Sequence, residues 1–277
     1  MKRNYPIIKN LIDGSQKYRL ELFGMWIDSR RPHIPSTFGL VEIVNSLFNG
    51  EFTNFDINDE NRDRLIISPG HEGIVMYPFL ADKNYISKEE LKKFTHHDGI
   101  LRQYPDPSMP LVECPTGSLS HGLGIGGGMA ERRKNNVYVI ISDGEFWEGS
   151  TQEAMSLATR RKLRNLICIM NNNGTSILGE TKTAHEPLEE KWKSYNWFTQ
   201  RVNGHSYTEL LSAFDNIMSR IPSDENYHKP SVIIADTLKG KGIKEIEGDP
   251  MWHSRIPNNE QEKKFREELN KFNYITN

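Results

Sequence analysis

VYVIISDGEFWEG, residues 137–149, is the stretch that decides how this chain folds. Five apolar residues run without a break, which predicts a buried strand. Ser142, Asp143 and Gly144 follow at once, and Glu148 stands five residues after Asp143. In an open α/β sheet, ligands bind beyond the carboxyl ends of the strands. The stretch therefore predicts a carboxylate at a ligand-binding edge.

A second apolar run, NLICIM at residues 165–170, is followed by Asn171, Asn172 and Asn173. Asp143 and Asn173 lie 173 − 143 = 30 residues apart, which is the length of one βαβ unit. The two strands of such a unit are parallel and usually neighbours, so their carboxyl ends open on the same edge, about 5 Å apart. A carboxylate and an amide oxygen placed this way suit Mg²⁺, which takes its remaining oxygens from phosphates and water.

Two neighbours of Asp143 favour a diphosphate site. Gly144 has no side chain, so a diphosphate can approach its backbone closely. The helix expected to begin near Ser150 adds partial positive charge at its start. Asp143 alone would be interpreted more simply as a turn or helix-capping residue. Because Asn173 stands at the end of the next strand, the pair favours a metal–diphosphate site instead.

The rest of the chain continues the alternation of strands and helices. RLIIS (residues 64–68) and PSVIIADTLKGKG (residues 230–242) continue the predicted strands. FGLVEIVNSLF (residues 38–48) has apolar residues at helical spacing. This order predicts an α/β fold with a parallel β-sheet and helices on both faces.

The domain organisation follows from the same pattern. We expect one domain over residues 1–277, with a polar helical lead-in over about residues 1–31 and a polar final helix over about residues 258–273. The Pro- and Gly-rich segment at residues 96–122 should be a long loop. Loops of that length inside a compact domain are usually functional.

Composition excludes several classes of function. The net charge is −2 over 277 residues, so there is no electrostatic case for nucleic acid or an anionic membrane as a partner. The two cysteines, Cys114 and Cys168, are expected to be reduced thiols. No apolar run approaches the roughly 20 residues of a membrane helix, and the first residues lack the apolar core of a signal peptide. We therefore expect a soluble cytoplasmic protein.

These motifs together resemble the transketolase family. SDGEFWEG followed by NNNGTSILG, residues 142–149 and 171–179, is similar to the thiamine-diphosphate motif of that family, which is G-D-G, about thirty residues and then N. The resemblance covers roughly residues 30–255. Four more segments resemble the family in its own order: RPHIPSTFGLVEI (31–43), RDRLIISPGHEG (62–73), LVECPTGSLSHGLGIGGGMA (111–130) and LKGKGIKEIEGDPMWH (238–253).

The resemblance implies thiamine diphosphate and Mg²⁺ as cofactors. The implied metal ligands are the side chains of Asp143 and Asn173 and the carbonyl oxygen of Thr175. The implied catalytic residues are His33, His71 and Glu148, of which Glu148 matches an acid in a carboxylate network across the subunit contact. His33 and Tyr104 are the implied substrate-facing residues. The implied cofactor-binding residues are His71, Gly117, Leu119, Gly144, Asn173, Ile177 and His253.

Some positions depart from the family pattern. Ser142 replaces the first glycine of G-D-G, and Asn172 stands where many relatives have Asp. His121 stands where the family usually has Gln. Tyr104 stands about where many relatives have a substrate-contacting histidine. A phenol can donate a hydrogen bond but, unlike imidazole, does not titrate near neutral pH, so the departure at Tyr104 bears on the substrate.

The resemblance also implies a partner. Family members hold the cofactor between this diphosphate-binding half and a second, pyrimidine-binding domain, and the present chain reaches Asn277 directly after the first half. We therefore expect the amino-terminal subunit of a split transketolase, paired with a separate C-terminal subunit in an α₂β₂ assembly. Such an assembly transfers a two-carbon ketol unit from a ketose to an aldehyde acceptor, and its substrates are small sugars.

Three alternatives compete with this interpretation. Gly122, Gly124 and Gly127 satisfy the G-x-G-x-x-G fingerprint of an NAD-dependent oxidoreductase, but no strand directly precedes them. A serine hydrolase at SLSHG would need glycine where Ser118 stands. A homologue that binds the cofactor but has altered catalysis is the third alternative, and Tyr104 keeps it open.

Overall fold

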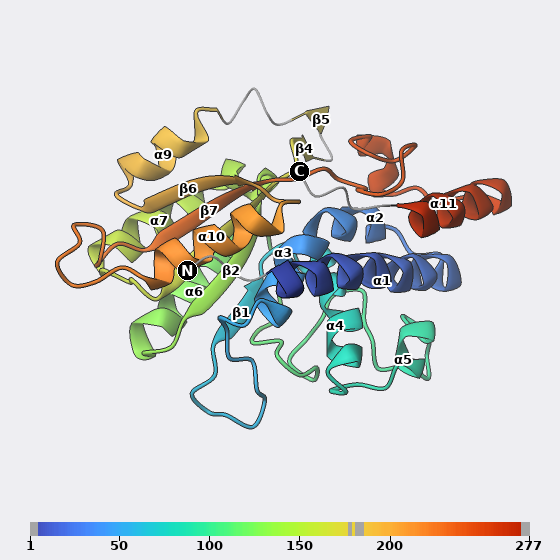
Figure 1. Cartoon of the computed structure of the whole chain (residues 1–277), viewed down its shortest axis with the longest axis horizontal. Coiled ribbons are helices and arrows are strands. Elements are labelled where there is room, and N and C mark those ends of the chain that lie inside the picture. The colour runs from blue at the N-terminus through green and yellow to red at the C-terminus, as the bar shows by residue number, and fades with distance from the viewer. Residues whose placement is uncertain (1–4, 177–178, 181–185, 273–277) are drawn as a thin grey trace.

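The computed structural model describes residues 5–176, 179–180 and 186–272 of the chain. A five-stranded sheet forms its centre, in the order β1-β2-β3-β7-β6, and every neighbouring pair is parallel. Figure 1 shows these strands between two groups of helices. The predicted α/β fold with a parallel sheet is confirmed. The strands are β1 (Arg64–Ile67), β2 (Val137–Ser142), β3 (Leu166–Asn172), β6 (Phe198–Asn203) and β7 (Ser231–Asp236).

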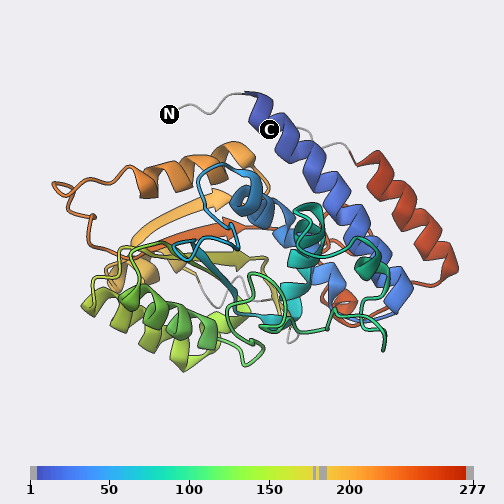
Figure 2. The ribbon, with the colours of Figure 1, turned by 90° about the horizontal axis from the view of Figure 1, so that it is seen from below.

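The apolar side chains of β2 alternate between the two faces of the sheet, and both faces are buried. On β2, the side chains of Val137, Val139 and Ile141 pack into one buried cluster, whereas Tyr138 and Ile140 pack into another. Because side chains alternate along a strand, an unbroken apolar strand must be covered by helices on both faces. Figure 2 shows this sandwich, with the sheet seen between the two helical layers.

The helices on one face are α6 (His121–Arg132), α7 (Gly149–Arg160) and α9 (Leu188–Ser194). The other face is covered by α1 (Tyr5–Ser29), α3 (Val41–Asn49) and α10 (Tyr207–Met218). Helices on both faces are thus confirmed. Both α6 and α7 begin at the carboxyl edge of the sheet, after the segments that follow β1 and β2.

The segment expected as a polar helical lead-in forms a helix with one buried face. Helix α1 does occupy the predicted place, but Leu22, Phe23 and Trp26 are fully buried in it. Arg19 is also buried and pairs with the Glu42 carboxylate of α3 at 2.7 Å. The sequence analysis did not identify this apolar face, because its residues lie among charged ones and the segment as a whole has a polar composition.

The predicted final helix is α11 (Asn259–Lys271). Asn258 and Gln261 form a reciprocal capping box at its start, which satisfies two backbone N–H groups. Phe265 and Leu269 are its buried residues, and the helix packs along α1. The two ends of the described chain therefore lie side by side, as Figures 1 and 2 both show.

Short helical elements shape the carboxyl edge of the sheet. The segment after β1 forms the 3₁₀ helix η2 (Gly70–Val75), and the segment after β2 forms η3 (Gly144–Trp147). Two more, α2 (Ile34–Thr37) and η4 (Pro250–His253), pack together near the same edge. The remaining elements are η1 (Phe38–Leu40), α4 (Met76–Asp82), α5 (Glu89–Lys92), β4 (Thr175–Ser176) and β5 (Gly179–Glu180).

The predicted long loop is also observed. Between α5 and α6 the chain has turns and irregular backbone, and α6 begins at His121, inside the predicted range. Cys114 and Cys168 are free thiols, as expected. Within the part of the chain that the structure describes, no helix has the length and apolar character needed to cross a membrane.

Candidate active site at the carboxyl edge of the sheet

Strand register brings the two predicted metal ligands together. Ser142 of β2 lies opposite Asn171 of β3, and the backbone N–H of Asp143 donates to the carbonyl oxygen of Asn171 at 3.2 Å. The buried Asp143 carboxylate accepts the N–H of Gly174 through Oδ2 at 2.8 Å. The side chain of Asp143 therefore lies against the backbone directly after Asn173. We call Asp143, Asn173 and Thr175 the diphosphate edge.

The donor types at the diphosphate edge fit Mg²⁺. One carboxylate, one amide oxygen and one backbone carbonyl are hard oxygen donors, and this ion takes few of these from protein. The Oδ1 atom of Asn173 accepts from the N–H of Thr175 at 3.0 Å and from its hydroxyl at 2.8 Å, so these hydrogen bonds hold the amide oxygen next to Thr175. Among the described residues, no three His, Cys, Asp or Glu side chains gather as a metal site. The predicted set contains only one residue of those types, Asp143.

The sequence analysis missed a buried carboxylate, that of Glu145, which connects three structural elements at this edge. Glu145 is fully buried and accepts hydrogen bonds from the Ser68 hydroxyl, from the Ser120 N–H at 2.6 Å and from the Ser142 N–H at 2.8 Å. These three partners come from the end of β1, the start of α6 and the end of β2. Burial raises the pKa of Glu145, and the hydrogen bonds oppose that rise. The only sequence signal was an acid two residues after Asp143.

The glycine fingerprint of the NAD alternative has a different role. Gly122, Gly124 and Gly127 lie inside helix α6, not in a turn between a strand and a helix. At Gly122, an added Cβ would come within 2.5 Å of the Ser68 side chain, and the Gly122 N–H donates to the Ser68 hydroxyl at 3.1 Å. Gly122 is therefore needed for close packing of α6 on the end of β1. The oxidoreductase alternative is not supported.

Three histidines meet at the same edge of the sheet. His33 precedes α2, His71 lies in η2 and His253 ends η4. The Nδ1 atom of His33 is 3.0 Å from Nε2 of His253, and the His71 ring centroid lies 5.3 Å and 5.4 Å from those of His33 and His253. We call these three residues the histidine cluster. It joins segments that are more than 200 residues apart in the chain.

The histidine cluster is neutral at neutral pH. Burial first, and then nearby positive charge, lower the pKa of His71 to about 3 and that of His253 to about 4. The pKa of His33 is lowered for the same reasons, burial first and then Lys239. Neutral imidazoles can each donate one proton and accept another, which suits positioning of sugar hydroxyl and carbonyl groups.

Lys239 sets the tautomers of this cluster. Its Nζ atom is 3.0 Å from Nδ1 of His253. An ammonium group only donates, so Nδ1 of His253 accepts and its proton sits on Nε2. That proton is donated to Nδ1 of His33, which leaves the His33 proton on Nε2. The hydrogen bond from Lys239 to His253 thus determines that Nε2 of His33 is the hydrogen-bond donor of that ring.

A buried acid, Glu72, lies near Lys239. Glu72 is fully buried, and burial raises its pKa to about 8, with Lys239 opposing the rise and Glu145 and Asp143 adding to it. Lys239 is also buried, which lowers its pKa, whereas Glu72 and Asp143 raise it. The Glu72 carboxylate also accepts from the amide of Asn171 on β3 at 3.5 Å, so Glu72 lies between the histidine cluster and the diphosphate edge. Sequence reasoning missed both residues, although each lies in a quoted motif, PGHEG or LKGKG.

The comparisons with known proteins agree with this geometry. The family model described as "Transketolase, thiamine diphosphate binding domain" matches residues 28–272. The chain belongs to this family. By family it is a transketolase-like, thiamine-diphosphate-dependent transferase subunit.

Several curated relatives have nearly the same length as this chain. It is 35% identical over 247 residues to one subunit of the apulose-4-phosphate transketolase of Actinobacillus succinogenes, covering 86% of this chain and 87% of the relative. It is 30% identical over 262 residues to the corresponding protein from Phocaeicola vulgatus, covering 89% of each. It is also 32% identical over 253 residues to the 6-deoxy-6-sulfo-D-fructose transketolase subunit SqwG of a Clostridium species, covering 83% of this chain and 89% of the relative.

The solved transketolases are longer. The Campylobacter jejuni enzyme matches 99% of this chain with a TM-score of 0.85 at 27% identity, but the match covers only 45% of that enzyme. The chain thus spans less than half the length of this solved relative. It corresponds to a transketolase thiamine-diphosphate-binding domain and, in length, to the relatives that are themselves single subunits of a transketolase.

Other predicted residues of this transketolase-like chain lie around the edge. Gly117 has a φ of 134°, and an added Cβ there would lie 3.0 Å from the Tyr104 ring, so the two residues are in contact. The backbone N–H of Gly144 donates to Oδ1 of Asp143 at 3.0 Å. Leu119 and Glu148 are exposed and flank the contact between the Ser120 and Ser150 hydroxyls. Ile177 lies outside the described residues.

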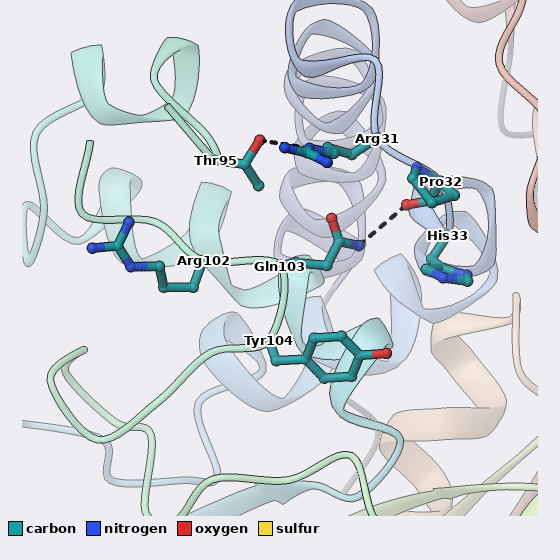
Figure 3. Close-up of a pocket in the computed structure, with 7 residues that line it drawn as sticks. All are labelled: Arg31, Pro32, His33, Thr95, Arg102, Gln103 and Tyr104. Atoms are coloured by element: carbon teal, nitrogen blue, oxygen red, sulfur yellow. Dashed lines mark hydrogen bonds between the residues drawn. The ribbon is translucent and has the colours of Figure 1, made fainter. Parts of the chain in front are cut away.

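A cavity opens beside His33. Its volume is about 380 Å³, and Figure 3 shows its wall, which comes from the end of α1 and from the long loop. Tyr104 lies on this wall with 45% of its surface exposed. The structure therefore brings the two predicted substrate-facing residues to one cavity, which we call the arginine cavity. Its lining residues are Arg31, Pro32, His33, Thr95, Arg102, Gln103 and Tyr104.

Proposed function

We propose that this chain is the thiamine-diphosphate-binding subunit of a split transketolase that transfers a two-carbon ketol unit from a ketose to an aldehyde. The main support is the meeting of the diphosphate edge and the histidine cluster at one edge of the sheet, where Lys239 lies 3.0 Å from Nδ1 of His253 and the buried Glu72 carboxylate accepts from the amide of Asn171 at 3.5 Å. Bound thiamine diphosphate supplies the electron sink for the carbanion, so the chain itself must hold the cofactor and manage protons.

Each part of the network has a place in this function. Mg²⁺ would be held by side-chain oxygens of Asp143 and Asn173 and by the carbonyl of Thr175, with phosphate oxygens completing its shell. Gly144, which has no side chain, would lie against the diphosphate. His71 and His253 would also contact the cofactor. His33 would donate its Nε2 proton to an oxygen of the sugar.

The relatives suggest the class of sugar. Their names specify apulose 4-phosphate in two cases and 6-deoxy-6-sulfo-D-fructose in a third, and both sugars have an anionic group at the end away from the ketol unit. We therefore propose a small anionic ketose as the donor. We further propose that the protein acts in the cytoplasm, in keeping with its free thiols.

A separate C-terminal subunit would complete the site, in an α₂β₂ assembly. Trp147 and Glu148 are exposed at the start of α7, and Leu119 is exposed beside them. On α6, an added Cβ at Gly124 or Gly128 would meet no atom within 4 Å. Glycine inside a helix is destabilising by about 1 kcal/mol relative to alanine, so these exposed glycines favour close approach of another chain.

The proposal is tested by reconstitution. Thiamine diphosphate with Mg²⁺ should raise the melting temperature of the isolated chain by mass action, and NAD should not. Ketol transfer from an anionic ketose to an aldehyde should appear only when the chain is mixed with its C-terminal partner. Robust transfer by the isolated chain would contradict the split-subunit proposal, and a chain that never binds thiamine diphosphate would contradict the function.

A further inference from the structure

A fourth histidine, His205, lies close to the end of β7, in the turn between β6 and α10. The Gly204 N–H donates to the carbonyl oxygen of Asp236, the last residue of β7, at 2.8 Å. An added Cβ at Gly204 would come within 2.5 Å of the Thr237 side chain, so glycine permits this close approach. The turn therefore places His205, whose side chain is 15% exposed, beside the segment that leaves β7.

Both ring nitrogens of His205 form hydrogen bonds. The backbone N–H of Leu238 donates to Nε2 at 2.9 Å, so Nε2 accepts and carries no proton. The ring proton is therefore on Nδ1, which donates to Oε2 of Glu42 at 2.9 Å. These two bonds form together only in the tautomer with the proton on Nδ1. The backbone donor at Leu238 thus fixes the tautomer of His205.

The acceptor of this ring is held in place from α1. Glu42 is fully buried, and its two carboxylate oxygens accept from the two terminal nitrogens of Arg19 at 2.7 Å each. Arg19 also donates to the carbonyl oxygen of Phe38 at 2.7 Å. Burial raises the pKa of Glu42, but Arg19 and the hydrogen bond from His205 outweigh it and hold the pKa below its ordinary value. His205 therefore contacts a carboxylate that is ionised and fixed in orientation.

The backbone that His205 contacts directly precedes Lys239. A chain that leaves a sheet must find new acceptors for its N–H groups. The N–H groups of Thr237 and Gly240 donate to backbone carbonyl oxygens at 3.0 Å and 3.1 Å. The Leu238 N–H instead donates to a side chain, that of His205. A substitution at His205 can therefore remove one hydrogen bond from this segment without changing the residues of the segment itself.

We propose that His205 is a positioning residue of the histidine cluster, which fixes the backbone at Leu238 and so directs the Lys239 ammonium group to Nδ1 of His253. The inference rests on the proposed function, which assigns the histidine cluster to the cofactor and the sugar. His205 acts through Lys239, because the 3.0 Å contact between Lys239 and His253 determines the tautomers of the cluster. Without the hydrogen bond at Leu238, the ammonium group loses its fixed direction, and both tautomers of His253 become populated.

The first test needs no variant. Nitrogen-15 NMR of the full-length chain, labelled at histidine, distinguishes protonated from unprotonated ring nitrogens at neutral pH. His205 should carry its proton on Nδ1, and His253 should carry its proton on Nε2. The signals are assigned by their loss in His205→Gln and His253→Asn. A proton on Nε2 of His205 would overturn the inference, because that nitrogen could then not accept the Leu238 N–H.

The second test compares His205→Asn with His205→Gln. The asparagine amide reaches only the place of Nδ1 and can still donate to Glu42, whereas the glutamine amide reaches the place of Nε2 and can accept the Leu238 N–H. Each variant loses one hydrogen bond, so their melting temperatures should fall by similar amounts. His205→Asn should show mixed tautomers at His253 and bind thiamine diphosphate with Mg²⁺ at least about fivefold more weakly.

His205→Gln should keep the His253 tautomer and a cofactor Kd within about twofold of the wild type. His97→Asn changes a ring that is 97% exposed and should leave the tautomer and the Kd unchanged. A wild-type His253 tautomer in His205→Asn, or equal losses of cofactor affinity in both His205 variants, would overturn the inference and leave His205 with a purely structural role. The tautomers are read without cofactor, so a chain that shows them but binds no thiamine diphosphate contradicts the proposed function alone.

Discussion

The diphosphate edge is built by strand register, whereas the histidine cluster and the arginine cavity are built by loops and short helical turns. Asp143 and Asn173 follow two adjacent strands that belong to one βαβ unit. His33 and His253 come from opposite ends of the chain and meet because η4 packs on α2. A site of the first kind can be inferred from spacing along the chain. A site of the second kind requires knowledge of which distant segments touch.

The two regions also differ in what holds them. At the diphosphate edge, buried Glu145 joins three elements through short hydrogen bonds. The walls of the arginine cavity are linked by two longer side-chain hydrogen bonds. The Gln103 amide donates to the Pro32 carbonyl oxygen, and the Arg31 guanidinium donates to the Thr95 hydroxyl. We therefore expect changes at the diphosphate edge to abolish cofactor binding or stability, and changes at the cavity to alter substrate preference.

The largest effect is expected from Asp143→Ala. Loss of the carboxylate should weaken Mg²⁺-dependent retention of thiamine diphosphate by at least about a hundredfold. The loss of two backbone hydrogen bonds should decrease the free energy of unfolding by only about 1–2 kcal/mol. Cofactor retention is measured by calorimetry with Mg²⁺ and with a chelator. Asp143→Asn is the control for side-chain size, and unchanged retention in the alanine variant would remove Asp143 from the metal site.

Glu145→Ala should mainly affect stability. It leaves the buried donors of Ser68, Ser120 and Ser142 without an acceptor, so the free energy of unfolding in urea should fall by about 2–4 kcal/mol. Glu153→Ala, at an exposed position of α7, is the matched control and should change it by less than about 0.5 kcal/mol. Equal small effects in both variants would show that Glu145 does not connect the three elements.

The histidine cluster should make stability depend on pH. The pKa of His71 is about 3 in the folded chain and near 6.5 in the unfolded chain, so the unfolded chain binds more protons between these values. Stability should therefore be fully present above pH 6.5 and decrease as the pH falls toward 3, by at most about 1.4 kcal/mol per pH unit for this group.

His71→Asn tests this origin. Urea unfolding between pH 7 and pH 5 should show a shallower loss of stability in the variant than in the wild type. His97→Asn changes a ring that is 97% exposed and should leave the slope unchanged. Parallel slopes in the wild type and His71→Asn would mean that other groups cause the acid sensitivity.

The smallest effect is expected from Tyr104→His. Tyr104 lines the arginine cavity and touches Gly117, so the change should shift the preference among sugar substrates by about tenfold or less and leave cofactor affinity nearly unchanged. Relative kcat/KM values of the reconstituted complex and calorimetric cofactor titrations separate the two effects. Equal changes in both would argue against a substrate-facing position.

The sequence predicted the strands of the sheet, but it did not predict which ionisable residues are buried. Unbroken apolar runs such as VYVII leave little choice except a strand buried on both faces. Glu72, Glu145 and Lys239 are buried charged residues that only partners from other segments can stabilise. The buried apolar residues of α1 were not recognised in the sequence either, because polar residues dominate the composition of that segment.

By itself, the sequence determined the parallel α/β fold, the family and the 30-residue spacing of Asp143 and Asn173, because strand periodicity and the length of a βαβ unit are local properties. Only the tertiary structure decided the strand order, the meeting of His33, His71 and His253, and the placement of His33 and Tyr104 in one cavity. These depend on contacts between distant segments, and such contacts form only when the whole chain packs around a shared core.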